Sequence, residues 1–143
     1  MKYLVALILL SSTVLAGNCP NLAGTYAVCS NSDNAWTGTK NLEIKQTEEN
    51  GQIRYVITSD GGPFSLQDYD VIADGESHVI RSDDTLTGTQ TVSCYEGKLV
   101  VELAVDNHSP DVEDFIRRTE LMKLGNKIFF IDDKEEPVNC SSN

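Results

Sequence analysis

Short apolar runs alternate with turn-forming residues along most of this chain, and the pattern restricts it to an antiparallel β-structure. Successive side chains of a strand point to opposite faces, so a half-buried strand shows apolar and polar residues in turn. Residues 41–47 and 52–59 follow this pattern on either side of Asn50-Gly51. Because Asn-Gly tolerates the positive φ angles of a type I′ turn, we predict a β-hairpin there.

Nine β-type runs are bounded by turn residues in this way. They cover residues 23–30, 41–47, 52–59, 64–72, 77–81, 87–94, 98–105, 115–123 and 127–131. A helix over residues 109–122 is the alternative near the end, since Pro110 and the acidic residues after it fit a first helical turn. However, Val112, Ile116 and Met122 do not form a continuous helical stripe. We therefore predict a loop followed by a strand.

The short links between runs indicate that strands follow one another side by side. Antiparallel strands joined in this way bury one face, so the sheet must curl or stack to hide it. We predict an all-β fold, an antiparallel up-and-down meander of about eight to nine strands closing into a small barrel. A two-sheet sandwich is the alternative, disfavoured because the links are too short for Greek-key crossings.

The first sixteen residues have the pattern of a signal peptide. Lys2 precedes a short apolar segment, and Val14-Leu15-Ala16 carry small residues where a signal peptidase cleaves. The apolar segment is too short to span a bilayer of about 30 Å as a helix. We predict a signal peptide over residues 1–16, a single β-barrel domain over residues 17–143 and a secreted or periplasmic location, without membrane insertion.

The four cysteines, Cys19, Cys29, Cys94 and Cys140, follow this leader. An even number without metal-ligand spacing in an exported chain predicts two disulfides. Pairing Cys19 with Cys29 is disfavoured, because an extended strand between them spans about 30 Å. Either Cys19–Cys94 occurs with Cys29–Cys140, or Cys19–Cys140 with Cys29–Cys94. We favour the second pairing, because it would join the first strand to the last.

Charge and motifs narrow the classes of function. The formal net charge is −11, which becomes −12 once Lys2 is removed with the leader. Nucleic acid and anionic membranes are therefore disfavoured as partners. The chain has no GxSxG, HExxH or SxxK motif, and we expect no catalytic residue, no metal and no cofactor. His78 is expected at an edge or surface, and His108 in a loop.

Residues 106–114 contain the densest group of oxygen ligands in the chain, but they lack the glycine and the spacing of an EF-hand loop. We expect a solvated acidic loop there. The same loop and residues 30–40, which contain Trp36, are the contact surfaces in one functional hypothesis. In that hypothesis the protein is an interaction or inhibitor-type module on a disulfide-stapled scaffold. An acid–base hydrolase is a third and weaker hypothesis.

Gly24-Thr25-Tyr26, with Cys19-Pro20-Asn21-Leu22 before it, resembles the opening of small lipocalin-like (calycin) barrels. Tyr26 stands where that family usually has tryptophan, and the family's later Thr-Asp-Tyr signature has no match. The resemblance implies a barrel that carries a small apolar ligand. The implied lining consists of Tyr26, Ile53, Tyr55, Leu99, Val101 and Leu103. Our leading hypothesis is an exported non-catalytic binding protein of this kind, although the same residues could simply fill the barrel.

Overall fold

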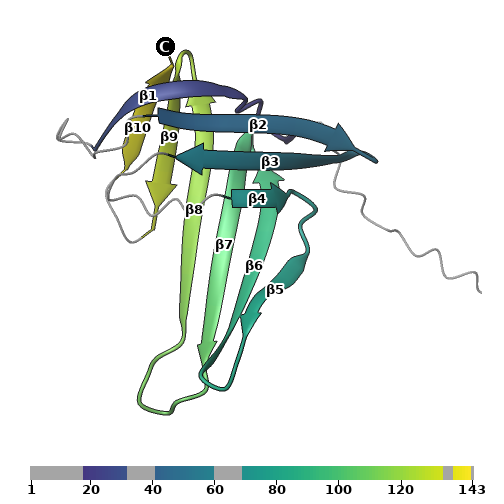
Figure 1. The fold of residues 1–143 in the computed structure, drawn as a ribbon, viewed down its shortest axis with the longest axis vertical. Helices are drawn as coiled ribbons and strands as arrows, with labels where there is room; N and C mark the ends of the chain where they lie inside the picture. Colours follow the sequence, from purple (N-terminus) through teal and green to yellow (C-terminus); the bar gives the residue numbers. More distant parts are fainter. Residues whose placement is uncertain (1–17, 32–40, 60–68, 134–136, 143) are drawn as a thin grey trace, which may run out of the picture.

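The computed structural model describes residues 18–31, 41–59, 69–133 and 137–142. These residues form one antiparallel sheet (Figure 1). Its ten strands are β1 (Gly24–Asn31), β2 (Asn41–Glu49), β3 (Gln52–Ser59), β4 (Tyr69–Ile72), β5 (Ser77–Ser82), β6 (Leu86–Tyr95), β7 (Lys98–Asn107), β8 (Phe115–Leu124), β9 (Lys127–Asp132) and β10 (Val138–Ser142). The all-β prediction is confirmed.

The strands follow the order β4-β3-β2-β1-β10-β9-β8-β7-β6-β5 across the sheet. Every pair of neighbours is consecutive in the chain except β1 and β10, so the up-and-down order is confirmed. The expected closure into a barrel is not found, because β4 and β5 form the two edges and do not pair with each other. The two strands diverge in space: β4 lies along β3, whereas β5 runs away from it beside β6 (Figure 1).

The nine predicted runs correspond to β1 to β9, with the fourth described only from Tyr69 onward. The loop-and-strand prediction for residues 109–123 is confirmed, since β8 begins at Phe115. The expected count of about eight to nine was too low. The missed strand is β10, whose sequence Val-Asn-Cys-Ser-Ser contains too few apolar residues to show a clear alternation.

Two hairpin turns have positive φ angles at both central residues, as the sequence predicts for Asn50-Gly51. Asn50 and Gly51 have φ angles of 53° and 77°, and Glu96 and Gly97 have φ angles of 50° and 74°. Positive φ at both central residues is the mark of a type I′ turn, whose twist matches that of the flanking strands. The Asn50-Gly51 hairpin is thereby confirmed, with β2 and β3 paired from Leu42–Ser59 to Glu49–Gln52.

The hydrophobic core lies where β2, β3 and β4 cross the upper parts of β6, β7 and β8 (Figure 1). Leu42 and Ile44 of β2 are buried between exposed neighbours, as the alternation predicts. They pack with buried residues of the opposite layer, among them Leu99, Leu121 and Ile128. This crossing leaves one part of the sheet covered and another part uncovered.

Two disulfides tie the ends of the described chain to the sheet. They are Cys19–Cys94 and Cys29–Cys140, so the favoured pairing was wrong and the alternative pairing is the one observed. Cys29 and Cys140 face each other in the ladder between β1 and β10. A disulfide between the first and the last strand is therefore present, as expected, but it is formed by Cys29 of β1. Cys19 precedes β1 and is bonded to Cys94 of β6 instead. Two disulfides are compatible with an extracellular or periplasmic location.

Residues 1–16, the predicted signal peptide, lie outside the described residues, as does Trp36. The described residues include no helix that is long and apolar enough to cross a membrane.

Candidate functional site

The predicted ligand-lining residues Tyr26, Ile53, Tyr55 and Leu99 are all buried in the core. The hydroxyl groups of both tyrosines are already used by the chain itself. Tyr26 donates to the Leu22 carbonyl oxygen and Tyr55 to the Pro20 carbonyl oxygen, each at 2.8 Å. These bonds hold residues 20–22 against one end of the core, and burial raises the pKa of Tyr55 to about 12.

Gly24 gives Tyr26 the space that its ring occupies. With a φ angle of 152°, Gly24 has a backbone conformation that other residues rarely adopt. A Cβ atom at this position would lie 3.3 Å from the Tyr26 hydroxyl oxygen. Lys123 places its Nζ atom 5.7 Å from the centre of the Tyr26 ring. The Gly24-Thr25-Tyr26 segment thus closes this end of the core.

Val101, another predicted lining residue, borders a small cavity between the two layers. The cavity has a volume of about 10 Å³ and is lined by Ile57, Tyr69, Val71, Val101, Thr119 and Leu121. A single water molecule needs about this much space, so a small apolar ligand would not fit here. Around Val101 the described core is filled by its own side chains.

Leu103, the last predicted lining residue, lies outside the core. Residues Leu99, Val101, Leu103 and Val105 share one face of β7, because side chains alternate along a strand. Leu99 is fully buried, whereas Leu103 and Val105 are only half-buried. The face that forms the core therefore continues past the crossing strands into a region that they do not cover.

We call the uncovered part of β5–β8, together with the turns at residues 83–85 and 107–114, the tip. On its inner face the ladder pairs Gly88 with Val105 and Val105 with Phe115. Ile80 lies on the same face, since its Cγ1 atom is 3.6 Å from where a Gly88 Cβ would be. With Leu86 and Leu103, these side chains form a surface that we call the apolar patch, defined as Ile80, Leu86, Leu103, Val105 and Phe115.

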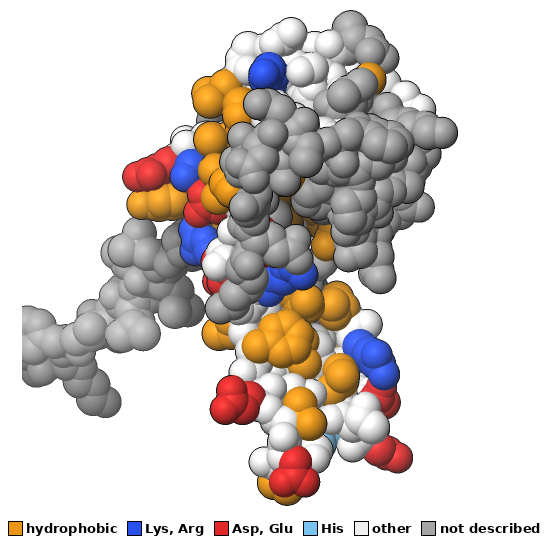
Figure 2. All heavy atoms as spheres, turned by 90° about the vertical axis from the view of Figure 1, so that its left-hand side faces the viewer, with side chains coloured by type: hydrophobic (Ala, Val, Ile, Leu, Met, Phe, Trp, Pro, Cys, Tyr) orange, Lys and Arg blue, Asp and Glu red, His pale blue; other side chains and the backbone are white. Residues whose placement is uncertain are grey.

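Two residues of the apolar patch are strongly exposed, whereas Leu86, Leu103 and Val105 are half-buried. Ile80 is 55% exposed and Phe115 48% exposed. Eight large apolar side chains of the described residues are exposed, and five of them belong to the tip: Val79, Ile80, Val112, Phe115 and Ile116. Figure 2 shows apolar side chains over the lower part of the molecule, with others along its upper left side. Ile80 and Phe115 lie on the inner face of the tip, and Val79 and Ile116 lie on its outer face. Exposed apolar side chains grouped in one region mark an interaction surface more often than scattered ones do.

A polar belt separates the apolar patch from the core. Arg117 and Thr119 of β8 both donate to the Asp132 carboxylate, at 2.7 Å and 3.1 Å. Tyr69 of β4 lies close to this pair; burial raises the pKa of Tyr69, Arg117 opposes the shift and Asp132 adds to it. These polar groups satisfy one another, so they mark the boundary between the buried and the exposed part of the same sheet face.

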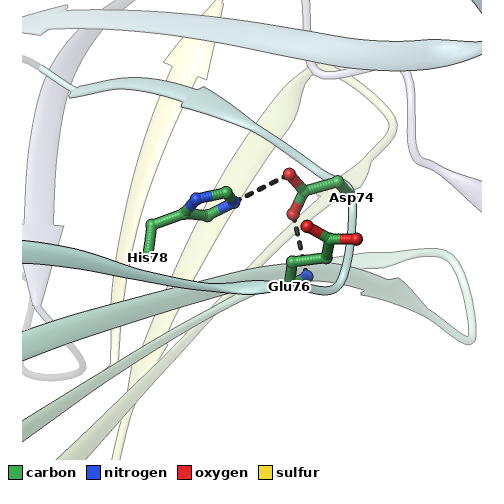
Figure 3. Close-up of side chains that lie close together, drawn as sticks. All are labelled: Asp74, Glu76 and His78. Atoms are coloured by element: carbon green, nitrogen blue, oxygen red, sulfur yellow. Dashed lines mark hydrogen bonds and ion pairs between the residues drawn. The ribbon is translucent and has the colours of Figure 1, made fainter.

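Asp74, Glu76 and His78 lie at the β5 edge, where the chain turns into the tip (Figure 3). Their side-chain donor atoms lie within 4.8 Å of one another. Carboxylates and imidazole are the donors that a zinc-like cation takes. In this structure, however, the Asp74 carboxylate accepts hydrogen bonds from the Glu76 amide and from His78, both at 2.8 Å. The arrangement shown is therefore a turn held by a histidine–aspartate pair.

The turn between β5 and β6 is organised by one carboxylate. Asp83 accepts hydrogen bonds from the Thr85 hydroxyl and amide, from Arg81 and from the Leu86 amide. These bonds, those from Thr85 most of all, hold the pKa of Asp83 well below its usual range. The turn is thus fixed at one side of the patch, and Arg81 is neutralised there.

The predicted contact loop at residues 106–114 forms the end of the tip. Asn107 anchors it, because its amide donates to Asp114 and its side chain donates to the Glu113 carbonyl oxygen, both at 2.7 Å. His108 is exposed, as predicted for a loop, and its ring contacts the Thr87 hydroxyl at 3.1 Å. The loop keeps Asp111 and Glu113 exposed beside Phe115.

The outer face of the same strands carries a polar hollow of about 290 Å³. It is lined by Thr91, Ser93, Tyr95, Val100, Glu102 and Arg118. Arg118 and Lys98 both pair with Glu120, at 3.1 Å and 2.7 Å, and these contacts lower the pKa of Glu120. Because these charges neutralise one another, the hollow is less suited to binding than the apolar patch.

Sequence reasoning placed Leu103 in a ligand cavity and missed the rest of the apolar patch. Two adjacent apolar pairs, Val79-Ile80 and Phe115-Ile116, were the available signal. Because neighbouring residues of a strand face opposite sides, each pair puts apolar side chains on both faces of the sheet. A soluble sheet with one buried face has little reason to do so.

Comparison of the chain with family models, with curated proteins and with solved structures finds no match. The candidate site therefore rests on its geometry.

Proposed function

We propose that the protein is an exported, non-catalytic binding module that contacts a protein partner through the apolar patch. The observation that carries the proposal is the continuation of the core-forming face of β6–β8 beyond the crossing strands, where Phe115 of β8 and Ile80 of the neighbouring β5 are exposed. Export follows from the leader-like segment and is supported by the two disulfides.

The alternative is the carrier of a small apolar ligand that the lipocalin-like opening implies. Tyr26, Tyr55 and Leu99 would line its binding cavity, but the described core around Val101 leaves only about 10 Å³. Cavities that hold small molecules usually exceed about 300 Å³. The packing therefore favours the interaction module over the carrier.

The test compares two exposed apolar residues at opposite ends of β8. Phe115, in the apolar patch, is 48% exposed, and Leu124, at the other end, is 59% exposed. Burying a side chain of this size contributes about 1.5–3 kcal/mol, so Phe115→Ser should weaken partner binding by about tenfold to a hundredfold. Leu124→Ser is the matched control, and its binding should be unchanged.

Native mass spectrometry of both variants and the unaltered protein, purified from the natural source, gives the readout. A protein partner retained by the unaltered protein and by Leu124→Ser, but lost from Phe115→Ser, is the expected result. A partner retained by all three would contradict the proposal. A small lipophilic molecule retained by all three would establish the carrier instead.

A further inference from the structure

Carboxylates without a cationic partner among the described residues lie in the two turns at the end of the tip, next to the apolar patch. Within the part of the chain that the structure describes, Arg81 pairs with Asp83 and Arg117 with Asp132, both at 2.7 Å, so these cations are already neutralised. Asp84, Asp111 and Glu113 have no cation among their described contacts and are exposed. Figure 2 shows carboxylates around the lower end of the molecule, next to the apolar side chains.

The charge of the whole chain argues against a second copy as the occupant. With a net charge of −11, two copies joined through this surface would bring two acidic tips together. Opposed like charges cost free energy at an interface, whereas a cationic partner is attracted from a distance. The same argument disfavours an anionic lipid surface or a nucleic acid as the occupant.

The face of the sheet, rather than its edge, is the contact surface. β5 is an edge strand, but its ladder with β6 shifts register between Val79 and Arg81. A bulge and a charged side chain are features that protect a sheet edge from pairing with another strand. The inner face beside it has no such protection.

From these observations we propose that the occupant of the apolar patch is a basic segment of another protein. Its apolar side chains pack on Ile80 and Phe115, and its lysine or arginine side chains contact Asp84, Asp111 and Glu113. This inference rests on the proposed function, because it names the class of partner for the same surface.

The probe is a 13-residue synthetic peptide (about 40 Å if extended) of alternating lysine and leucine. Two comparison peptides replace lysine with glutamate or with serine. Affinity is measured by calorimetry at low and moderate salt for the unaltered protein and for a tip variant, Asp84→Asn, Asp111→Asn and Glu113→Gln. The matched control removes three carboxylates from β2 instead, as Glu43→Gln, Glu48→Gln and Glu49→Gln.

The lysine–leucine peptide should bind the unaltered protein and the β2 control within about twofold of each other, and the tip variant about tenfold more weakly. Binding should weaken as salt increases, because exposed charges are screened. Equal losses in the tip variant and the β2 control, or no binding of the lysine–leucine peptide at low salt, would overturn the inference.

A fourth protein, Phe115→Ser, separates this inference from the proposed function. If the serine–leucine peptide binds as tightly as the lysine–leucine peptide and both are lost in Phe115→Ser, the partner is apolar but not basic. The proposed function then stands and the inference fails. If Phe115→Ser binds every peptide as the unaltered protein does, the apolar patch is not the contact surface and both fail.

Discussion

At the scale of single residues, buried tyrosines have a structural role in this protein. Tyr55 is fully buried, and its hydroxyl reaches the Pro20 carbonyl oxygen, 35 residues away in the chain. The hydrogen bond satisfies a carbonyl that would otherwise lose its partner next to the core. A residue selected from the sequence as part of a ligand cavity therefore holds the N-terminal segment in place.

Tyr55→Phe should lower the free energy of unfolding by about 1 kcal/mol, the usual net value of such a hydrogen bond. Because folding raises the pKa of Tyr55 from 10.0 to about 12, its contribution to stability is complete below pH 10.0. It is then lost as the pH rises through about 12. Denaturant unfolding between neutral and strongly alkaline pH measures both effects.

Tyr95→Phe is the control for this substitution, since the Tyr95 ring is 59% exposed. Its free energy of unfolding should stay within about 0.5 kcal/mol of the unaltered value. The Tyr55→Phe variant should also show a shallower loss of stability in alkaline solution. Identical alkaline profiles for Tyr55→Phe and the unaltered protein would refute the role assigned to the Tyr55 hydroxyl.

At the scale of secondary structure, the sequence predicts strands well wherever a single face is buried. In β2 and β3, alternation and an Asn-Gly turn give both the strand positions and their register. β10 was not predicted, because only Val138 and Cys140 of this strand are buried. A single valine followed by a cysteine and two serines does not give a recognisable alternation of apolar and polar residues. In the structure β10 pairs with β1 on one side and with β9 on the other. The pairing with β1 joins residues more than 100 positions apart, so no local pattern in the sequence indicates it.

The β2–β3 turn allows a test of how far local conformation stabilises the sheet. Gly51 has a φ angle of 77°, and a Cβ atom added there would have no neighbour within 4 Å. Gly51→Ala should therefore destabilise the protein through backbone strain alone, by about 1 kcal/mol. Gly51→Asn should cost less, because asparagine tolerates the left-handed region. Thermal unfolding compares the two, and an equal cost would argue against the type I′ turn.

At the scale of the whole molecule, the sequence could not show which strands cross which. Leu99 and Leu103 lie on the same face of β7 and look equivalent in the sequence, yet only Leu99 is covered by the opposite layer. The apolar patch depends on this difference, which arises from the angle between the two groups of strands. Likewise, the disulfide pairing depended on where Cys19 lies relative to the ends of the strands.

The two disulfides should each contribute strongly to stability. They join residues separated by 75 and 111 positions, and cross-links over such long loops restrict the unfolded chain most. Removing either pair by alanine substitution should lower the free energy of unfolding by about 3–5 kcal/mol. The larger loss is expected for Cys29–Cys140, because both of its cysteines are buried and alanine would leave a cavity.

Urea unfolding of the two double variants measures these losses, and peptide mapping without reductant checks the connectivity. Peptides linked as Cys19–Cys94 and Cys29–Cys140 are expected. Recovery of Cys29 linked to Cys94 would contradict the sheet order, because Cys29 pairs with Cys140 across neighbouring strands.

The position of β1 between β2 and β10 has a consequence for biosynthesis. β1 is synthesised before β2 and β10, and it receives its second neighbour only when β10, the last strand, has been made. During that interval one side of β1 is unpaired and Cys29 lacks its disulfide partner, Cys140. A nascent polypeptide arrested anywhere upstream of β10 would keep that open side, so both the β1–β10 ladder and the Cys29–Cys140 bond form only after synthesis of β10.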